Sequence, residues 1–212
     1  MDAHADTFKS TILWGPPGCG KSTVANLMAR YTERVYRKLS AVTSGVKDVR
    51  SIVEQARNAL KLQVGTHTRW FVWLCTLFTF LPRTPSFAQR RRTVLFVDEI
   101  HRFNKAQQDA FLPHVESGLV TLIGATTENP SFALNSALLS RCRVVVLRKL
   151  TQAELMAVLD RAVCSAKGLG GWGIRVSNDV RKGIASVADG DARSAMNALE
   201  LAAQFTVGVF FL

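Results

Sequence analysis

The sequence has few cysteines and no long apolar run, and each shortage excludes a class of protein. The four cysteines, Cys19, Cys75, Cys142 and Cys164, lie far apart and show none of the spacings of a zinc site. They therefore indicate a reducing compartment and no metal held by thiolates. The longest apolar run, residues 70–81, has 12 residues, whereas a membrane-spanning helix needs about 20. We expect neither a zinc protein nor a membrane-spanning one.

Acidic residues are scarce relative to basic ones. The chain of 212 residues carries 27 Lys and Arg against 16 Asp and Glu, a formal net charge of +11. Such a balance attracts phosphate backbones. However, residues 61–92 hold one Lys and five Arg with no acid, and so contribute +6 of the total. The hydrophobic content of 48% is typical of a globular chain of one or two domains.

A phosphate-binding loop is the first positive signal. Residues 15–22 read Gly-Pro-Pro-Gly-Cys-Gly-Lys-Ser and match the Walker A pattern G-x-x-x-x-G-K-[ST]. An apolar stretch at 11–14 predicts a strand before the loop, and residues 21–30 predict a helix after it. Glycines let successive N–H groups turn towards phosphate oxygens, and the helix N-terminus adds its positive end. A glycine-rich turn without a ligand is the alternative interpretation.

A second motif follows an apolar run at 93–97. Asp98 and Glu99 end this run, which predicts a buried parallel strand with both carboxylates at its carboxyl end. Asp98 would hold Mg²⁺ as a Walker B aspartate, together with the hydroxyl of Ser22, and Glu99 would polarise the attacking water. We expect ATP to be bound by Gly15, Pro16, Pro17, Gly18, Cys19, Gly20, Lys21, Ser22, Thr23 and Asp98.

Two P-loop classes compete with an ATPase on these motifs alone. A GTPase would carry an N-K-x-D sequence that reads guanine, and the chain has none. A small-molecule kinase remains open. Two solvated acids at the end of a strand, with no ligand, are the structural alternative for Asp98 and Glu99.

Three further runs carry a family resemblance. They are D-E-I-H-R-F-N-K at 98–105, G-A-T-T-E-N-P-S-F at 124–132 and L-L-S-R-C-R at 138–143. Together with the two Walker motifs, they closely resemble the AAA+ ATPases of the RarA/Mgs type, which include the Werner-helicase-interacting proteins. The resemblance extends over residues 10–60 and 91–204. It implies ATP hydrolysis with Mg²⁺, coupled to forked or single-stranded DNA at stalled or damaged replication forks, in a homo-oligomer.

The resemblance also implies an α/β P-loop AAA+ core and roles for residues beyond Walker B. The expected core is a parallel five-stranded sheet of order 5-1-4-3-2, followed by an incomplete helical lid. Thr127 would be sensor 1, with Asn129 as the runner-up. Arg141 would act on the neighbouring subunit's ATP, and Arg193, in Gly-Asp-Ala-Arg, would be sensor 2. Without the resemblance, Arg141 reads as a solvated charge at a helix end.

The remaining interpretations concern boundaries and neighbouring side chains. We expect a nucleotide-binding core over 1–149 and a partial lid over 150–212, where T-Q-A-E at 151–154 is a capping box. Residues 63–90 interrupt the pattern as an apolar and basic insert, and residues 64–89 read either as a translated intron or as a genuine loop. His101 and Arg102 read as a DNA or subunit contact, or as a polar turn.

The function classes left open are three. The first is a DNA-associated ATPase in replication and repair. The second is a regulatory fragment that binds ATP without hydrolysing it, because we expect the family's C-terminal oligomerisation domain to begin where this sequence stops. The third is the small-molecule kinase. No secretion signal is visible, so we expect a nuclear location in a eukaryote and a cytoplasmic one otherwise.

Overall fold

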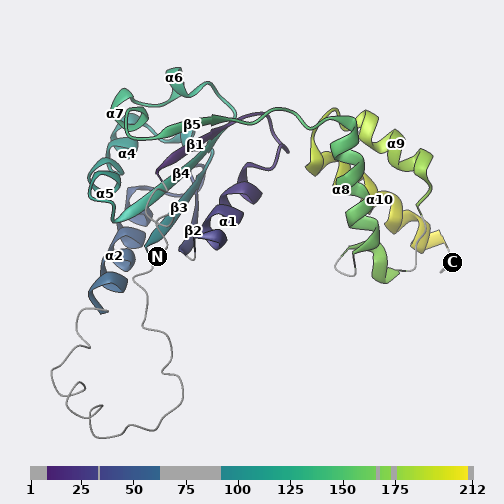
Figure 1. Cartoon of the computed structure of the whole chain (residues 1–212), viewed down its shortest axis with the longest axis horizontal. Helices are drawn as coiled ribbons and strands as arrows, with labels where there is room; N and C mark the ends of the chain where they lie inside the picture. The colour runs from purple at the N-terminus through teal and green to yellow at the C-terminus, as the bar shows by residue number, and fades with distance from the viewer. Residues whose placement is uncertain (1–8, 33, 63–91, 166–167, 173–175, 210–212) are drawn as a thin grey trace, which may run out of the picture. The chain divides into compact units, whose positions relative to one another are not determined.

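The computed structural model describes residues 9–32, 34–62, 92–165, 168–172 and 176–209. Its centre is a parallel five-stranded sheet with the order β2-β3-β4-β1-β5 (Figure 1). This order is the predicted 5-1-4-3-2 read from the opposite edge, so the predicted fold class is confirmed. The strands are β1 (Thr11–Trp14), β2 (Val35–Ser40), β3 (Thr93–Asp98), β4 (Val120–Thr126) and β5 (Arg143–Val146).

The central strands are mostly apolar because both faces of the sheet are covered. β3 and β4 are buried at nearly every position, as expected of parallel strands between helix layers. β2 pairs with β3 in parallel register, with Tyr36 opposite Val94 and Ser40 opposite Asp98. The sequence did not single out β2 as a strand, since its charged residues are those of a half-exposed strand at the edge of the sheet.

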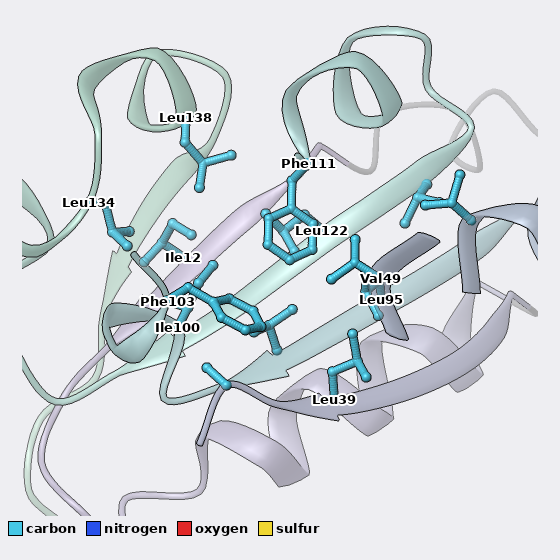
Figure 2. Packing of buried hydrophobic residues seen from close by; sticks show 14 of the residues in the cluster. Ile12, Leu39, Val49, Leu95, Ile100, Phe103, Phe111, Leu122, Leu134 and Leu138 are labelled. Atoms are coloured by element: carbon cyan, nitrogen blue, oxygen red, sulfur yellow. The ribbon is translucent and has the colours of Figure 1, made fainter. Parts of the chain in front are cut away.

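One face of the sheet carries the larger core. Ile12, Leu95 and Leu122 from three strands meet Phe103, Phe111 and other side chains of the covering segments (Figure 2). Figure 1 shows α1 on the opposite face. The helices of this part are α1 (Lys21–Tyr31), α2 (Val46–Leu62), η1 (Ile100–Arg102), α4 (Lys105–Asp109), α5 (Leu112–Glu116), α6 (Pro130–Ala133) and α7 (Ser136–Leu139).

The chain divides into two compact units. The first comprises Met1–Leu13 and Ser22–Val145, and the second comprises Trp14–Lys21 and Val146–Leu212. The second unit is helical beyond β5, and its core forms around Leu155, Leu159 and Leu199. Its helices are α8 (Gln152–Cys164), η2 (Leu169–Trp172), α9 (Asn178–Val187) and α10 (Ala192–Val209).

The capping box predicted from sequence is present in this second unit, formed by Thr151 and Glu154 at the start of α8. Ser177 caps α9. The domain boundary at residue 149 and the lid over 150–212 stay predictions. The insert at 63–90, including the intron hypothesis for 64–89, lies outside the described residues.

Candidate active site

The phosphate loop runs from the end of β1 into the first turn of α1. Gly18 and Gly20 have φ of 66° and 92°, a region that residues with a Cβ rarely enter. Gly15 has a different reason to be glycine, because a Cβ there would lie 2.4 Å from the carbonyl oxygen of Leu147. The sequence predicted that the loop glycines give the backbone its freedom. It did not predict the close approach of the Leu147 carbonyl oxygen to Gly15.

Lys21 turns back into the loop. Its Nζ donates to the carbonyl oxygens of Gly15 and Pro16, at 2.8 and 2.7 Å, and the residue is 9% exposed. No carboxylate among the described residues pairs with this ammonium. A buried cation held only by neutral groups, here two carbonyl oxygens and the Cys19 sulfur at 4.0 Å, is costly unless an anion binds beside it. The loop therefore fits a phosphate group.

The first turn of α1 adds further donors. Lys21, Ser22 and Thr23 open the helix, so their backbone N–H groups have no acceptor one turn earlier. The N-terminus of a helix favours negative charge for the same reason. Cys19 is buried, Ser22 is half-buried, and Pro17 and Thr23 are exposed.

Within the second unit, the loop contacts the start of α10. Asp191 caps that helix, its Oδ1 accepting from the N–H groups of Arg193 and Ser194 at 2.8 and 3.1 Å. The same carboxylate lies where a Cβ on Gly18 would be, 1.7 Å from its position. Ala192 N–H also donates to the Gly18 carbonyl oxygen at 3.3 Å. The loop and the predicted sensor 2 segment are thus physically joined.

Asp98 ends β3 and faces β2. Its Oδ2 lies 3.8 Å from Lys38 Nζ, and its side chain is 27% exposed. The ring of Tyr36 stacks on Phe96, two residues before Asp98. Burial, and secondarily the Asp98 carboxylate, raise the pKa of Tyr36. Asp98 and Ser22 belong to the same unit and offer the carboxylate and hydroxyl oxygens that Mg²⁺ prefers.

Glu99 lies at a sharp turn after β3. Its φ of 56° and ψ of 42° are left-handed, a conformation that costs a non-glycine residue about 1–2 kcal/mol. Such outliers concentrate at functional sites. Adjacent side chains on a strand point to opposite faces, and this turn ends the strand between Asp98 and Glu99; that both serve one site stays a prediction. The Glu99 carboxylate lies 3.2 Å from His101 Nε2.

His101 is buried, with a side chain 3% exposed. Its Nδ1 lies 3.0 Å from Thr126 Oγ1 at the end of β4, and its Nε2 also lies 3.5 Å from Glu128 Oε1. The His101 side chain therefore faces these three groups instead of solvent. Arg102, next to it, is exposed.

The predicted sensor 1 candidates lie just beyond β4. Thr127 is exposed, whereas Thr126, the last residue of the strand, is fully buried. Asn129 caps α6 by accepting from Ser131 N–H at 3.0 Å. The assignment of sensor 1 to Thr127 stays a prediction.

The two predicted arginines differ in their surroundings. Arg141 forms an ion pair with Glu116 at 2.5 Å and donates to the carbonyl oxygen of Ala137 at 2.7 Å. Arg193 is exposed on the first turn of α10. No side-chain contact of Arg193 is found among the residues the structure describes.

Sequence reasoning missed several residues around these groups. They are Lys38, Glu116, Thr126 and Glu128, and the role of Asp191 beside Gly18 was not foreseen. Their contacts join segments far apart in the sequence: Lys38 to Asp98, Glu116 to Arg141, and Thr126 and Glu128 to His101.

Comparisons with known proteins agree with this geometry. Residues 11–150 match the ATPase family associated with various cellular activities (AAA). The chain belongs to this family. The AAA match covers both Walker motifs and all five strands of the sheet.

Two individual proteins match this chain over nearly its whole length. This AAA chain is 48% identical over 201 residues to the Replication-associated recombination protein A of Escherichia coli, covering 94% of the chain and 39% of that protein. It is 44% identical over 193 residues to the ATPase WRNIP1 of Dictyostelium discoideum, covering 91% of the chain and 19% of that protein. The predicted resemblance to this group is therefore confirmed, and the chain spans well under half of these relatives.

A solved structure supports the fold independently. The Thermotoga maritima RuvB Holliday junction branch migration motor is 26% identical with a TM-score of 0.61, covering 89% of this chain and 52% of that one. No helix in the described part of the AAA chain is both long and apolar enough to cross a membrane.

Proposed function

We propose that this AAA chain binds ATP with Mg²⁺ and hydrolyses it in the service of DNA replication and recombination. The observation that carries the proposal is the buried Lys21 ammonium, held by carbonyl oxygens inside a phosphate loop. Its similarity to a Replication-associated recombination protein supports the DNA-related role. The positive formal charge agrees with a nucleic-acid partner.

The proposed chemistry is in-line attack of water on the γ-phosphorus. Glu99 orients the water and accepts its proton while the new P–O bond forms and the bond to the β–γ bridging oxygen breaks. ADP and inorganic phosphate leave. Lys21 binds the β- and γ-phosphates, and Thr127, or Asn129 as the runner-up, helps to place the water. Ser22 and Asp98 would hold Mg²⁺, which would supply positive charge beside the phosphates.

Two arginines complete the proposed site. Arg193 reaches the γ-phosphate as sensor 2, and Arg141 acts on the ATP of a neighbouring subunit. Hydrolysis then requires a homo-oligomer. The ion pair between Arg141 and Glu116 is half-exposed, and exposed pairs contribute only about 0–1 kcal/mol. Releasing Arg141 to a neighbour is therefore inexpensive.

An ATPase assay with and without forked or single-stranded DNA tests the proposal. We expect turnover stimulated by DNA, with Glu99→Gln lowering kcat by about 10²–10⁴-fold because the general base is lost. Lys21→Ala is expected to weaken ATP binding by about 10–100-fold, since a charge-assisted contact is removed. Glu54→Gln, which alters an exposed carboxylate on α2, is the matched control.

Other outcomes would assign a different function. Tight ATP binding without turnover would contradict hydrolysis and indicate a regulatory nucleotide-binding fragment. Phosphate transfer to a metabolite, independent of DNA, would indicate a kinase. Running the assay beside a version that lacks residues 64–89 separates the effect of that segment from the chemistry.

A further inference from the structure

His101 lies among three polar groups that come from separate segments of the first unit. Glu99 precedes it at the turn after β3, Thr126 ends β4, and Glu128 follows that strand. Because the ring is 3% exposed, water cannot readily replace these partners. A buried imidazole with a partner at each nitrogen has a fixed orientation.

Hydrogen-bond accounting assigns the donors. Nε2 faces the carboxylates of Glu99 and Glu128, and ionised carboxylates only accept, so Nε2 must donate. In a neutral ring Nδ1 then accepts, and its partner is the hydroxyl of Thr126 at 3.0 Å. That hydroxyl also accepts from Glu128 N–H at 3.1 Å, and the Glu128 carbonyl oxygen, 3.2 Å away, is a second acceptor for its proton. When the hydroxyl donates to Nδ1, hydrogen bonds run from Glu128 N–H through Thr126 and His101 to Glu99.

This series of hydrogen bonds ends on the Glu99 carboxylate, which accepts the proton of the attacking water in the proposed reaction. Among the described residues, His101 is the group that pairs with the Glu99 carboxylate. Glu99 itself is exposed on one side, with a side chain 36% exposed, and would otherwise be free to rotate. We propose that His101 is a positioning residue that holds the Glu99 carboxylate for the attacking water and ties it to the end of β4. This inference rests on the proposed ATP hydrolysis.

Two amide substitutions separate the nitrogens of the ring. In His101→Gln the side-chain amide reaches the place of Nε2, so a donor to Glu99 is kept and the Thr126 contact is lost. In His101→Asn the amide occupies the place of Nδ1, so the Thr126 contact is kept and the donor to Glu99 is lost. A residue that merely fills the core would not distinguish the two.

Steady-state kinetics provide the main test, with melting temperatures measured for both variants. We expect His101→Asn to lower kcat by about 10²-fold, as misplacement of a catalytic group by about 1 Å does, with little change in KM for ATP. His101→Gln should keep most of kcat. In a Glu99→Gln background His101→Asn should have no further effect on the residual single-turnover rate, because residues that act as a unit are not additive.

Equal losses in the Asn and Gln variants would overturn the proposal, as would a rise in KM that matches the fall in kcat. A loss that persists undiminished in the Glu99→Gln background would also overturn it. If the unchanged chain hydrolyses ATP and His101→Asn matches it, the role of His101 fails while the proposed function stands. If the unchanged chain shows no turnover that depends on Lys21, the proposed function fails, and the role of His101 in hydrolysis fails with it.

A spectroscopic readout tests the contact without turnover. We expect an imidazole N–H resonance in the ¹⁵N spectrum of the nucleotide-free chain that exchanges slowly with water, assigned by its loss in His101→Gln. Glu99→Ala should shift it or hasten its exchange. The absence of such a resonance, or its indifference to Glu99→Ala, would overturn the proposal even in a chain that hydrolyses ATP.

Discussion

Two features of the structure favour glycine at position 18: its positive φ and the close approach of Asp191. Comparison with Gly118 separates the two effects. Gly18 and Gly118 have the same φ of 66°. A Cβ on Gly118 would meet nothing within 4 Å, whereas one on Gly18 would collide with the Asp191 carboxylate. The motif predicts the first effect from sequence. The second arises only because α10 begins against the loop.

Alanine substitutions at Gly118 and Gly18 measure what each feature contributes to the free energy of unfolding. Gly118→Ala should cost about 1–2 kcal/mol of unfolding free energy, the strain of a left-handed non-glycine residue. Gly18→Ala should cost more, because Asp191 must also move away from its capping position. Denaturant unfolding of both variants checks the order. An equal cost would show that Asp191 does not press on Gly18 in solution.

At the scale of the element, α8 begins where its sequence requires. Thr151 N–H donates to Glu154 Oε2 at 2.7 Å, and Glu154 N–H donates to Thr151 Oγ1 at 3.3 Å. The backbone hydrogen bond from Thr151, with a smaller part from Arg148, lowers the pKa of Glu154 below its ordinary value of 4.5. A capping box of this kind can be predicted from four consecutive residues of the sequence.

The lowered pKa makes the stability of α8 depend on pH. Because the folded state favours the ionised form, Glu154 contributes stability above its ordinary pKa of 4.5 and loses it as the pH falls through the lowered value. We therefore expect Glu154→Gln to unfold more easily than the unchanged chain at pH 7, with the difference vanishing on acidification. Glu200→Gln, which removes an exposed charge from α10, is the control. A pH-independent difference would contradict the assignment.

Elements with weaker local patterns were harder to predict. The sequence indicated β1 and the helix after it, since an apolar strand, a glycine loop and a helical repeat follow each other directly. β2 was missed because charged side chains at Arg37 and Lys38 dilute its pattern at the sheet edge. At the end of β4, Thr126 is buried and Thr127 is exposed, and both lie beyond Gly124, the last residue paired with β3.

At the scale of the whole molecule, the Arg141 assignment depends on a second copy of the chain. Within one chain Arg141 pairs with Glu116, and the proposed role in a neighbour's site would need that pair to open. The basic charge is also unevenly placed, since residues 61–92 hold +6 of the +11. Removing residues 64–89 takes away Arg69 and Arg83, +2 of that +6, so any DNA affinity should be measured with and without that segment.

Mixing two inactive variants tests the composite site. Arg141→Ala chains keep Lys21 and Glu99, while Glu99→Gln chains keep Arg141. If the arginine acts between subunits, as fingers supplied in trans do, mixing the two should restore part of the ATPase activity that each lacks alone. Mixing either with itself is the control. Activity that stays absent at all ratios would place Arg141 in its own chain's site or outside the reaction.

The sequence by itself determined the strand–loop–helix, the two Walker motifs and the capping box at 151–154, while the sheet order followed from the family resemblance. The first three depend on local spacing, glycine geometry and apolar periodicity, which act over a few residues. Only the tertiary structure decided that His101 is enclosed by Glu99, Thr126 and Glu128, that Asp191 lies on Gly18, and that Arg141 pairs with Glu116. Those contacts join residues far apart in the chain, and their energies depend on burial and distance, which no local pattern records.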